Sequence, residues 1–298
     1  MGLLLVLSDH FGIFPISFAH GIILSTKKYK DVSCECFDEG NFLLGAIGGD
    51  IIGSKYEFNN IKRKDFDILS PYADFTDDTV LTVAIAEGIL WHRDFVSLLK
   101  KYTRNYPHRG YGGNFFRWAL SDDYSPYNSW GNGAGMRVSP IGFAFNNLDR
   151  VLKEAKRSAE VTHNHPEGVK GAQAIASSIF LAREGKSKDN IKQYIEEKFG
   201  YDLSKHTDKI RPHYSFDVSC QGSVPESIRA FIDSTDYEDS IRIAISIGGD
   251  SDTIACMTGG IAEAFYGGIP LEIKEYILSK LPAEFCNVID NFYASYID

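Results

Sequence analysis

Residues 166–200 read PEGVKGAQAIASSIFLAREGKSKDNIKQYIEEKFG, and this stretch decides the fold class. Apolar residues recur at three- and four-residue spacing over Val169–Ala182 and again over Ile191–Phe199, which is the periodicity of α-helices with one buried face. A proline opens the first run, while Gly185 and Gly200 follow the two runs. Because proline favours a helix start and glycine a helix end, the stretch predicts two consecutive helices.

The same spacing recurs through most of the chain beyond residue 41. Further helices are expected at Leu81–Trp91, Phe95–Tyr102, Val151–Ala159, Ile254–Phe265, Leu271–Leu278 and about Pro282–Tyr296, with one more beginning at Pro225 and capped by Ser223. No convincing run of alternating apolar and polar residues predicts a strand. The sequence therefore predicts an all-α fold, in which residues 41–298 form a single compact many-helix domain and residues 1–40 an N-terminal extension of unknown role.

Several of these expected helices are rich in small residues, such as the segment that contains Gly259, Gly260, Ala262 and Ala264. Glycine costs up to about 1 kcal/mol per helix position relative to alanine. Such a density of small residues therefore predicts close contacts between helices.

Composition excludes several classes of protein. The chain has 298 residues and a formal net charge of −9 without clustered basic residues, which argues against a nucleic-acid-binding surface. Its five cysteines are scattered and form no CxxC pair, so neither a disulfide framework nor a zinc site is expected. No apolar run reaches the roughly 18–20 residues that span a membrane. These features favour a soluble cytoplasmic protein.

Two pairs of aspartates each precede an apolar helix. The first lies in FTDDT at residues 75–79, and the second in GGDSDT at residues 248–253. Capping explains one such pair, but two in one chain are hard to explain by capping. Carboxylates and threonine hydroxyls form a set of hard oxygen ligands that selects Mg²⁺, Mn²⁺ or Ca²⁺ over zinc. Because clustered carboxylates repel one another, the sequence predicts bound cations, and a shared carboxylate would hold two of them roughly 3.5–4 Å apart.

A third acidic feature lies in GDIIGSKYE at residues 49–57, where Asp50 and Glu57 are separated by about two helical turns. On one helix the two carboxylates would share a face. A solvated acidic face is the simple alternative. The surrounding glycines and apolar residues instead favour an inward-facing Glu57.

Through these and further motifs the chain resembles the ADP-ribosylglycohydrolase family from Phe42 to about Gly268. The motifs that carry the resemblance occur in family order: GDIIGSKYE (49–57), FTDDT (75–79), RGYG (109–112), GNGAGMRVSPIG (131–142), THNHP (162–166), SVP (223–225) and GGDSDT (248–253). One glycine-rich or DDT element alone is a weak signal. Seven ordered elements over more than two hundred residues are specific.

The resemblance implies an all-helical fold and two Mg²⁺ ions, for which Mn²⁺ can substitute. Carried over by motif, Thr76, Asp77 and Asp78 would bind one ion, Asp250 and Thr253 the other, and Asp252 both. Glu57 matches a glutamate that some members place beside the metals, and the candidate catalytic carboxylates are Glu57, Asp77 and Asp252.

Substrate contacts are expected from two loops and a histidine. The residues concerned are Gly131, Asn132, Gly133, Ala134, Gly135, Met136, Arg137, Tyr111, Gly112 and His163. The glycine-rich loop is rich in N–H groups and can approach a diphosphate closely. Arg137 adds charge there, with a structural salt bridge as the alternative. For Tyr111 the alternative is core packing, and for His163 it is capping or packing.

The implied activity is hydrolysis of the glycosidic bond between ADP-ribose and a modified acceptor, either a protein side chain or a small conjugate, which releases ADP-ribose. Two alternatives stay open: a non-catalytic ADP-ribose-binding or crystallin-like structural protein, and a two-metal ADP-ribose diphosphatase. The acceptor is not identified by the sequence, because arginine, serine, a nucleic-acid base, poly-ADP-ribose and O-acetyl-ADP-ribose all serve within the family.

Overall fold

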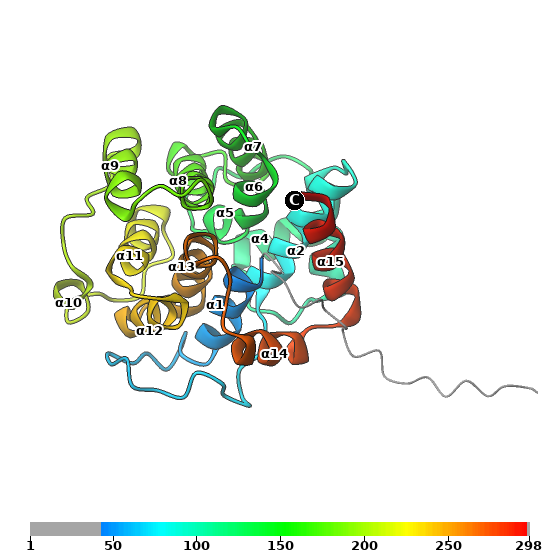
Figure 1. The fold of residues 1–298 in the computed structure, drawn as a ribbon. Helices are drawn as coiled ribbons and strands as arrows, with labels where there is room; N and C mark the ends of the chain where they lie inside the picture. The colour runs from blue at the N-terminus through cyan, green and yellow to red at the C-terminus, as the bar shows by residue number, and fades with distance from the viewer. Residues whose placement is uncertain (1–42, 297–298) are drawn as a thin grey trace, which may run out of the picture. The chain divides into compact units, whose positions relative to one another are not determined.

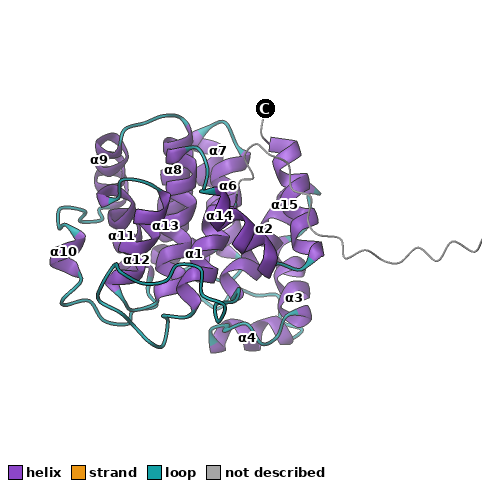
Figure 2. Ribbon diagram, turned by 60° about the horizontal axis from the view of Figure 1, so that its bottom comes forward, coloured by secondary structure: helices purple, strands orange, loops and turns teal. Residues whose placement is uncertain are grey.

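The computed structural model describes residues 43–296, which form helices joined by loops (Figures 1 and 2). In chain order the helices are α1 (Leu44–Ser54), α2 (Asp77–Leu90), α3 (Phe95–Asn105), α4 (Gly113–Leu120), α5 (Gly133–Met136), α6 (Ser139–Ala144), α7 (Leu148–Glu160), α8 (Pro166–Arg183), α9 (Lys188–Phe199), α10 (Thr207–Ile210), α11 (Cys220–Asp233), α12 (Tyr237–Ile247), α13 (Ser251–Tyr266), α14 (Leu271–Lys280) and α15 (Ala283–Tyr296). These described residues contain no strand, only one isolated bridge between Gly131 and Ser219. The predicted all-α fold is confirmed.

Helix α13 is central to the packing of the described residues. It packs against α1, α8, α11 and α12, and Figure 1 shows it among these helices. Every residue from Ser251 to Ala264 is buried. A helix that is covered on all sides has no solvated polar face, so its composition is dominated by small and apolar residues. The N-terminus of α13, and with it Asp252, is therefore held inside the protein.

Glycines allow α1 and α13 to approach each other backbone to backbone. A Cβ atom on Gly49 would lie 2.0 Å from the carbonyl oxygen of Ala255, and one on Gly259 would lie 2.1 Å from the carbonyl oxygen of Gly45. Both distances are far below van der Waals contact, so a side chain at either position would push the helices apart. The close helix contacts predicted from the small residues are confirmed.

The expected start of one helix is wrong. The sequence predicted a start at Pro225 with Ser223 as the N-cap, but α11 begins at Cys220 and its N-cap is Ser219. The Ser219 hydroxyl accepts a hydrogen bond of 3.0 Å from the backbone N–H three residues later. Pro225 lies inside the helix and removes one i→i−4 hydrogen bond. Burial of Cys220 and Val224 in the core offsets that loss.

Glu57 does not continue the helix that carries Asp50. Helix α1 ends at Ser54, and the Tyr56 amide donates to the Gly53 carbonyl over 2.8 Å, which tightens the chain into a turn. The prediction that both acidic residues share one helix face is wrong, because Glu57 lies beyond the helix. The turn nevertheless carries its carboxylate to the site described below.

The expected N-terminal extension, residues 1–40, lies outside the described residues, and its separation from the rest of the chain stays a prediction. Within residues 43–296 one hydrophobic core contains buried side chains from the whole length of that range, the first being Leu43 and the last Phe292. No helix in that range combines the length and the apolar character needed to cross a bilayer.

Candidate metal centre and active site

The N-termini of α2 and α13 meet at a cavity, although 175 residues separate Asp78 from Thr253. The Thr253 hydroxyl donates to the Asp78 carboxylate over 3.3 Å. The cavity has a volume of about 470 Å³, within the usual range for small-molecule sites. Its acidic wall consists of Glu57, Asp77, Asp78, Asp250 and Asp252, next to Thr253. The fold thus brings both predicted acidic clusters to one place.

Asp50 holds the N-terminus of α2. Its carboxylate accepts hydrogen bonds from the Thr76 amide (2.9 Å) and hydroxyl (2.6 Å), and from the Thr79 amide (3.0 Å) and hydroxyl (2.5 Å). Thr76 is the N-cap of α2, and its hydroxyl accepts from the Asp78 amide. Sequence reasoning missed this role of Asp50, because the partners lie 26 to 29 residues away and only the fold brings them together.

The loop before α13 places Asp250 without using its carboxylate as a cap. Gly248 and Gly249 have φ angles of 78° and 75°, which glycine adopts without strain. Asp250 occupies the N-cap position but makes no side-chain capping hydrogen bond. Its Oδ2 instead accepts from the Asn132 side chain over 2.6 Å. Helix capping therefore does not account for this aspartate.

Carboxylates of Glu57, Asp250 and Asp252 converge on one point. One oxygen of each lies within 4.8 Å of the others, which is a spacing that one cation can bridge. Burial, followed by the negative charges of Asp250 and Asp50, raises the pKa of Glu57 to about 7. Glu57 is partly exposed, whereas both aspartates are buried.

The remaining acidic groups are strongly desolvated. Burial, with neighbouring negative charges as the next cause, raises the pKa of Asp77, Asp78 and Asp252 well above the usual range. The Oδ2 atom of Asp78 is buried and has no hydrogen-bond partner within residues 43–296. A buried carboxylate oxygen without a donor is costly, and a divalent cation supplies the missing partner. The residues therefore fit a magnesium-type site.

The segment expected to bind a diphosphate divides into a loop and a short helix. Gly131, Asn132 and Gly133 line the cavity, as does Met136 at the end of α5. Ala134 and Gly135 are buried inside α5 and do not line it. A Cβ atom on Gly135 would lie 3.0 Å from the sulfur of Met257, so this glycine serves the packing of α5 on α13.

Arg137 forms a buried part of the cavity wall. One of its nitrogens, Nη2, donates to the Ser158 carbonyl (3.2 Å) and the Thr162 hydroxyl (2.8 Å), both uncharged. Its Nε and Nη1 atoms have no partner among the described residues. Burial lowers the pKa of Arg137 to about 10, so the guanidinium stays charged at neutral pH. Arg137 is therefore a desolvated cation, and two of its nitrogen atoms have no acceptor among the described residues.

Of the other predicted contact residues, two line the cavity and one does not. His163 lines the cavity, and burial together with the charge of Arg137 lowers its pKa well below the usual value, so the imidazole is neutral. Gly112 lines the cavity as the N-cap of α4. Tyr111 does not line it; its ring stacks against two phenylalanines of α4 at 5.8 and 5.9 Å between centroids, as the core-packing alternative requires.

Three exposed apolar side chains on the cavity wall were not identified from the sequence. Trp130, Phe216 and Val218 are each nearly half exposed. Exposed large apolar groups beside a cavity are suited to ligand contact. Trp130 directly precedes the GNGAG motif, which was an available signal. Phe216 and Val218 lie in a segment without a motif, and only the fold places them near Asp250.

The ADP-ribosylglycohydrolase family model matches residues 41–296. The chain is 27% identical to ADP-ribosylhydrolase ARH3 of Homo sapiens, over 76% of this chain and 84% of that protein. It is 24% identical to ADP-ribosylarginine hydrolase Tri1 of Pseudomonas putida, over 79% of this chain and 72% of that protein.

A solved structure of an ADP-ribosylglycohydrolase-related protein complex has a TM-score of 0.65 to this chain at 25% identity. The alignment covers 86% of this chain and 98% of the other. The family match and the fold comparison thus both cover most of the chain. The chain belongs to the ADP-ribosylglycohydrolase family, a family of hydrolases.

Proposed function

We propose that this chain is a dinuclear-metal hydrolase that cleaves the glycosidic bond between ADP-ribose and a modified acceptor and releases ADP-ribose. The observation that carries the proposal is the meeting of the α2 and α13 N-termini, marked by the contact between Asp78 and Thr253. Capping, the simplest use of these aspartates, does not require the two helix starts to share one cavity.

The proposed ligand sets follow the two helix starts. Thr76, Asp77 and Asp78 would hold one Mg²⁺ or Mn²⁺ ion, Asp250 and Thr253 the second, and Asp252 both. The Thr76 hydroxyl donates its hydrogen to Asp50 and accepts from the Asp78 amide, so one lone pair on its oxygen remains for a cation. Bound Mg²⁺ would act as a Lewis acid that orients the ribose hydroxyls and polarises the attacking water.

The chain's own residues then complete the reaction. The transition state of glycosidic cleavage resembles an oxocarbenium ion, so positive charge develops on the ribose. Glu57 presents a partly exposed carboxylate to the cavity beside Asp252. From that position it can accept the proton of the attacking water or stabilise the developing positive charge. Asp77 and Asp252 are the other candidates for this role.

We assign the ADP portion to the part of the cavity wall formed by the glycine-rich segment and its neighbours. The buried guanidinium of Arg137 adds positive charge behind this wall, which suits a diphosphate, and the Gly131–Gly133 segment lets its backbone approach closely. The exposed rings of Trp130 and Phe216 suit stacking on a planar base. His163, as a neutral imidazole at the same wall, completes this part of the site.

Product analysis tests the proposal. The protein is incubated with Mg²⁺ or Mn²⁺ and a panel of acceptors carrying ADP-ribose on arginine, serine, a nucleic-acid base, poly-ADP-ribose or O-acetyl-ADP-ribose. Free ADP-ribose, abolished by EDTA, is the expected product. Release of AMP and ribose phosphate would replace the proposal with diphosphate cleavage, and ADP-ribose binding without turnover would replace it with a binding role.

A further inference from the structure

Glu57 reaches the acidic cavity from a turn, and its position calls for a physical explanation. Helix α1 ends at Ser54, so no helical hydrogen bond fixes the Glu57 backbone. The carboxylate nevertheless lies close to those of Asp250 and Asp252. Like charges at this spacing repel, and an unrestrained turn would move Glu57 toward solvent. Contacts elsewhere on the turn must hold it in place.

Asn60 supplies those contacts through both ends of its side-chain amide. Its Nδ2 group donates to the carbonyl oxygens of Tyr56 (2.7 Å) and Glu57 (2.9 Å), which closes the turn. The same group donates to the Gly249 carbonyl (2.9 Å), and Oδ1 accepts from the Gly249 amide (2.6 Å). Asn60 therefore pairs with both backbone groups of the residue that directly precedes Asp250.

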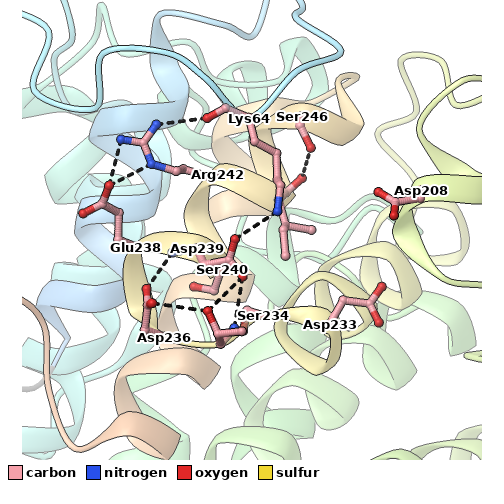
Figure 3. Close-up of polar contacts among 12 residues, drawn as sticks. Lys64, Asp208, Asp233, Ser234, Asp236, Glu238, Asp239, Ser240, Arg242 and Ser246 are labelled. Carbon is pink, nitrogen blue, oxygen red and sulfur yellow. Dashed lines mark hydrogen bonds and ion pairs between the residues drawn. The ribbon is translucent and has the colours of Figure 1, made fainter.

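The chain beyond Asn60 is fixed independently. Lys62 donates to the Ile247 carbonyl at the end of α12 and to the Tyr214 carbonyl. Figure 3 shows Lys64 against Asp239 of α12 and Arg242 beside Glu238. The Arg242 side chain also donates to the carbonyl oxygens of Lys64 and Phe66, over 3.0 and 2.7 Å. Loss of the Asn60 amide would thus loosen the turn at residues 56–60 while the following segment stays anchored to α12.

We propose that Asn60 is a positioning residue, whose amide ties the Glu57 turn to the Gly249 backbone and so holds the Glu57 carboxylate beside Asp250 and Asp252. The structural part of this inference stands by itself, and only the expected effect of Asn60 on turnover rests on the proposed function. Only a side-chain amide meets the geometry, because aspartate lacks the donors and leucine lacks donors and acceptor.

The test compares Asn60→Leu and Asn60→Asp with Asn59→Leu. Asn59 is the matched control, since it has the same side chain, is exposed and makes no hydrogen bond among residues 43–296. Hydrogen–deuterium exchange of the metal-free protein is measured over residues 56–60 and 248–250. Faster exchange of roughly tenfold or more is expected for Asn60→Leu, a smaller increase for Asn60→Asp and none for Asn59→Leu, because Asn60→Leu removes several hydrogen bonds and each contributes about 1 kcal/mol. Wild-type exchange in Asn60→Leu would overturn the inference without affecting the proposed function.

A double-mutant cycle with Glu57→Gln tests the link to catalysis. Asn60→Leu is expected to lower kcat about 10–100-fold, as misplacement of a catalytic group by about 1 Å does, with KM changed less than threefold. Because Asn60 acts through Glu57, the double variant should be no slower than Glu57→Gln alone. Additive losses, or full activity in Glu57→Gln, would overturn the positioning role. An inactive wild type would sink the proposed function, while the exchange measurement would still decide the structural claim.

Discussion

At the scale of single residues, Asp252 is a carboxylate that destabilises the metal-free fold and that the proposed metal site would explain. It is buried, and its pKa is raised by burial and then by the charge of Asp78. In the metal-free protein such a carboxylate opposes folding, whereas under the proposed function it would become a ligand of bound cations.

The Asp252→Asn variant is therefore expected to respond oppositely in two buffers. With EDTA its melting temperature should exceed that of the wild type, because one of several like charges is removed. With Mg²⁺ it should gain little stability and lose turnover. Differential scanning calorimetry in both buffers checks this. Asp122→Asn, at an exposed loop position, is the control for net charge, and a variant less stable than wild type in EDTA would contradict the argument.

Arg137 presents the reverse case, a buried cation whose hydrogen-bond partners are uncharged. Arg137→Met is expected to change the free energy of unfolding by less than about 2 kcal/mol, because two lost hydrogen bonds are offset by relief of a buried charge. The affinity for ADP-ribose in the presence of Mg²⁺ should fall at least tenfold. Calorimetric titration measures it, and unchanged affinity would remove Arg137 from the proposed diphosphate wall.

At the scale of secondary-structure elements, the contact between α1 and α13 includes an unusual cap. Glu263 of α13 is fully buried and accepts from the Leu43 amide (3.1 Å) at the start of α1. Backbone amides there lower its pKa, but burial outweighs them and raises the pKa to about 8. The folded state thus binds this proton more tightly than the unfolded state, where the value is 4.5.

The stability due to the Glu263 proton is complete below the unfolded pKa of 4.5 and is lost as the pH rises through about 8. Between these pH values this group should lower the free energy of unfolding of the wild type by up to about 1.4 kcal/mol per pH unit. Glu263→Gln should show a shallower decline, measured by urea unfolding at several pH values. Glu272→Gln, exposed on α14, should follow the wild type. Parallel curves for all three proteins would contradict the assignment.

At the scale of the whole molecule, the site joins elements that are remote in sequence. Asp78 lies on α2 and Asp252 on α13, and Asp50 of α1 holds the start of α2, so cations that bind the two helix starts in the proposed way would bind only the folded chain. Metal binding and folding are therefore linked.

Mg²⁺ or Mn²⁺ at 100 times its dissociation constant is expected to stabilise the fold by about 2.7 kcal/mol per site. For a chain of this size that corresponds to a rise in Tm of roughly 5–10 °C. Thermal unfolding with and without EDTA measures the shift. If the Tm at roughly 10 mM Mg²⁺ equals the Tm in EDTA, the folded protein has no such metal site.

Local patterns in the sequence predicted the fold class and the main features of the candidate site. Helical periodicity predicted the all-α fold, and the two aspartate pairs predicted an acidic site at helix starts. Predictions failed where local signals competed with packing. Pro225 lies inside α11 because burial of that helix outweighs one missing hydrogen bond, and Glu57 lies beyond α1 because the chain turns after Ser54.

By itself the sequence determined most of the longer helices and which residues carry hard oxygen ligands, because periodicity and ligand chemistry are properties of short segments. The tertiary structure alone decided that Asp78 and Thr253 touch, that Asp50 supports α2, and that Asn60 reaches Gly249 across 189 residues. These contacts depend on how α1 and α13 pack through their glycines. Packing of that kind sums many weak interactions between distant segments, and no local pattern encodes which segments meet.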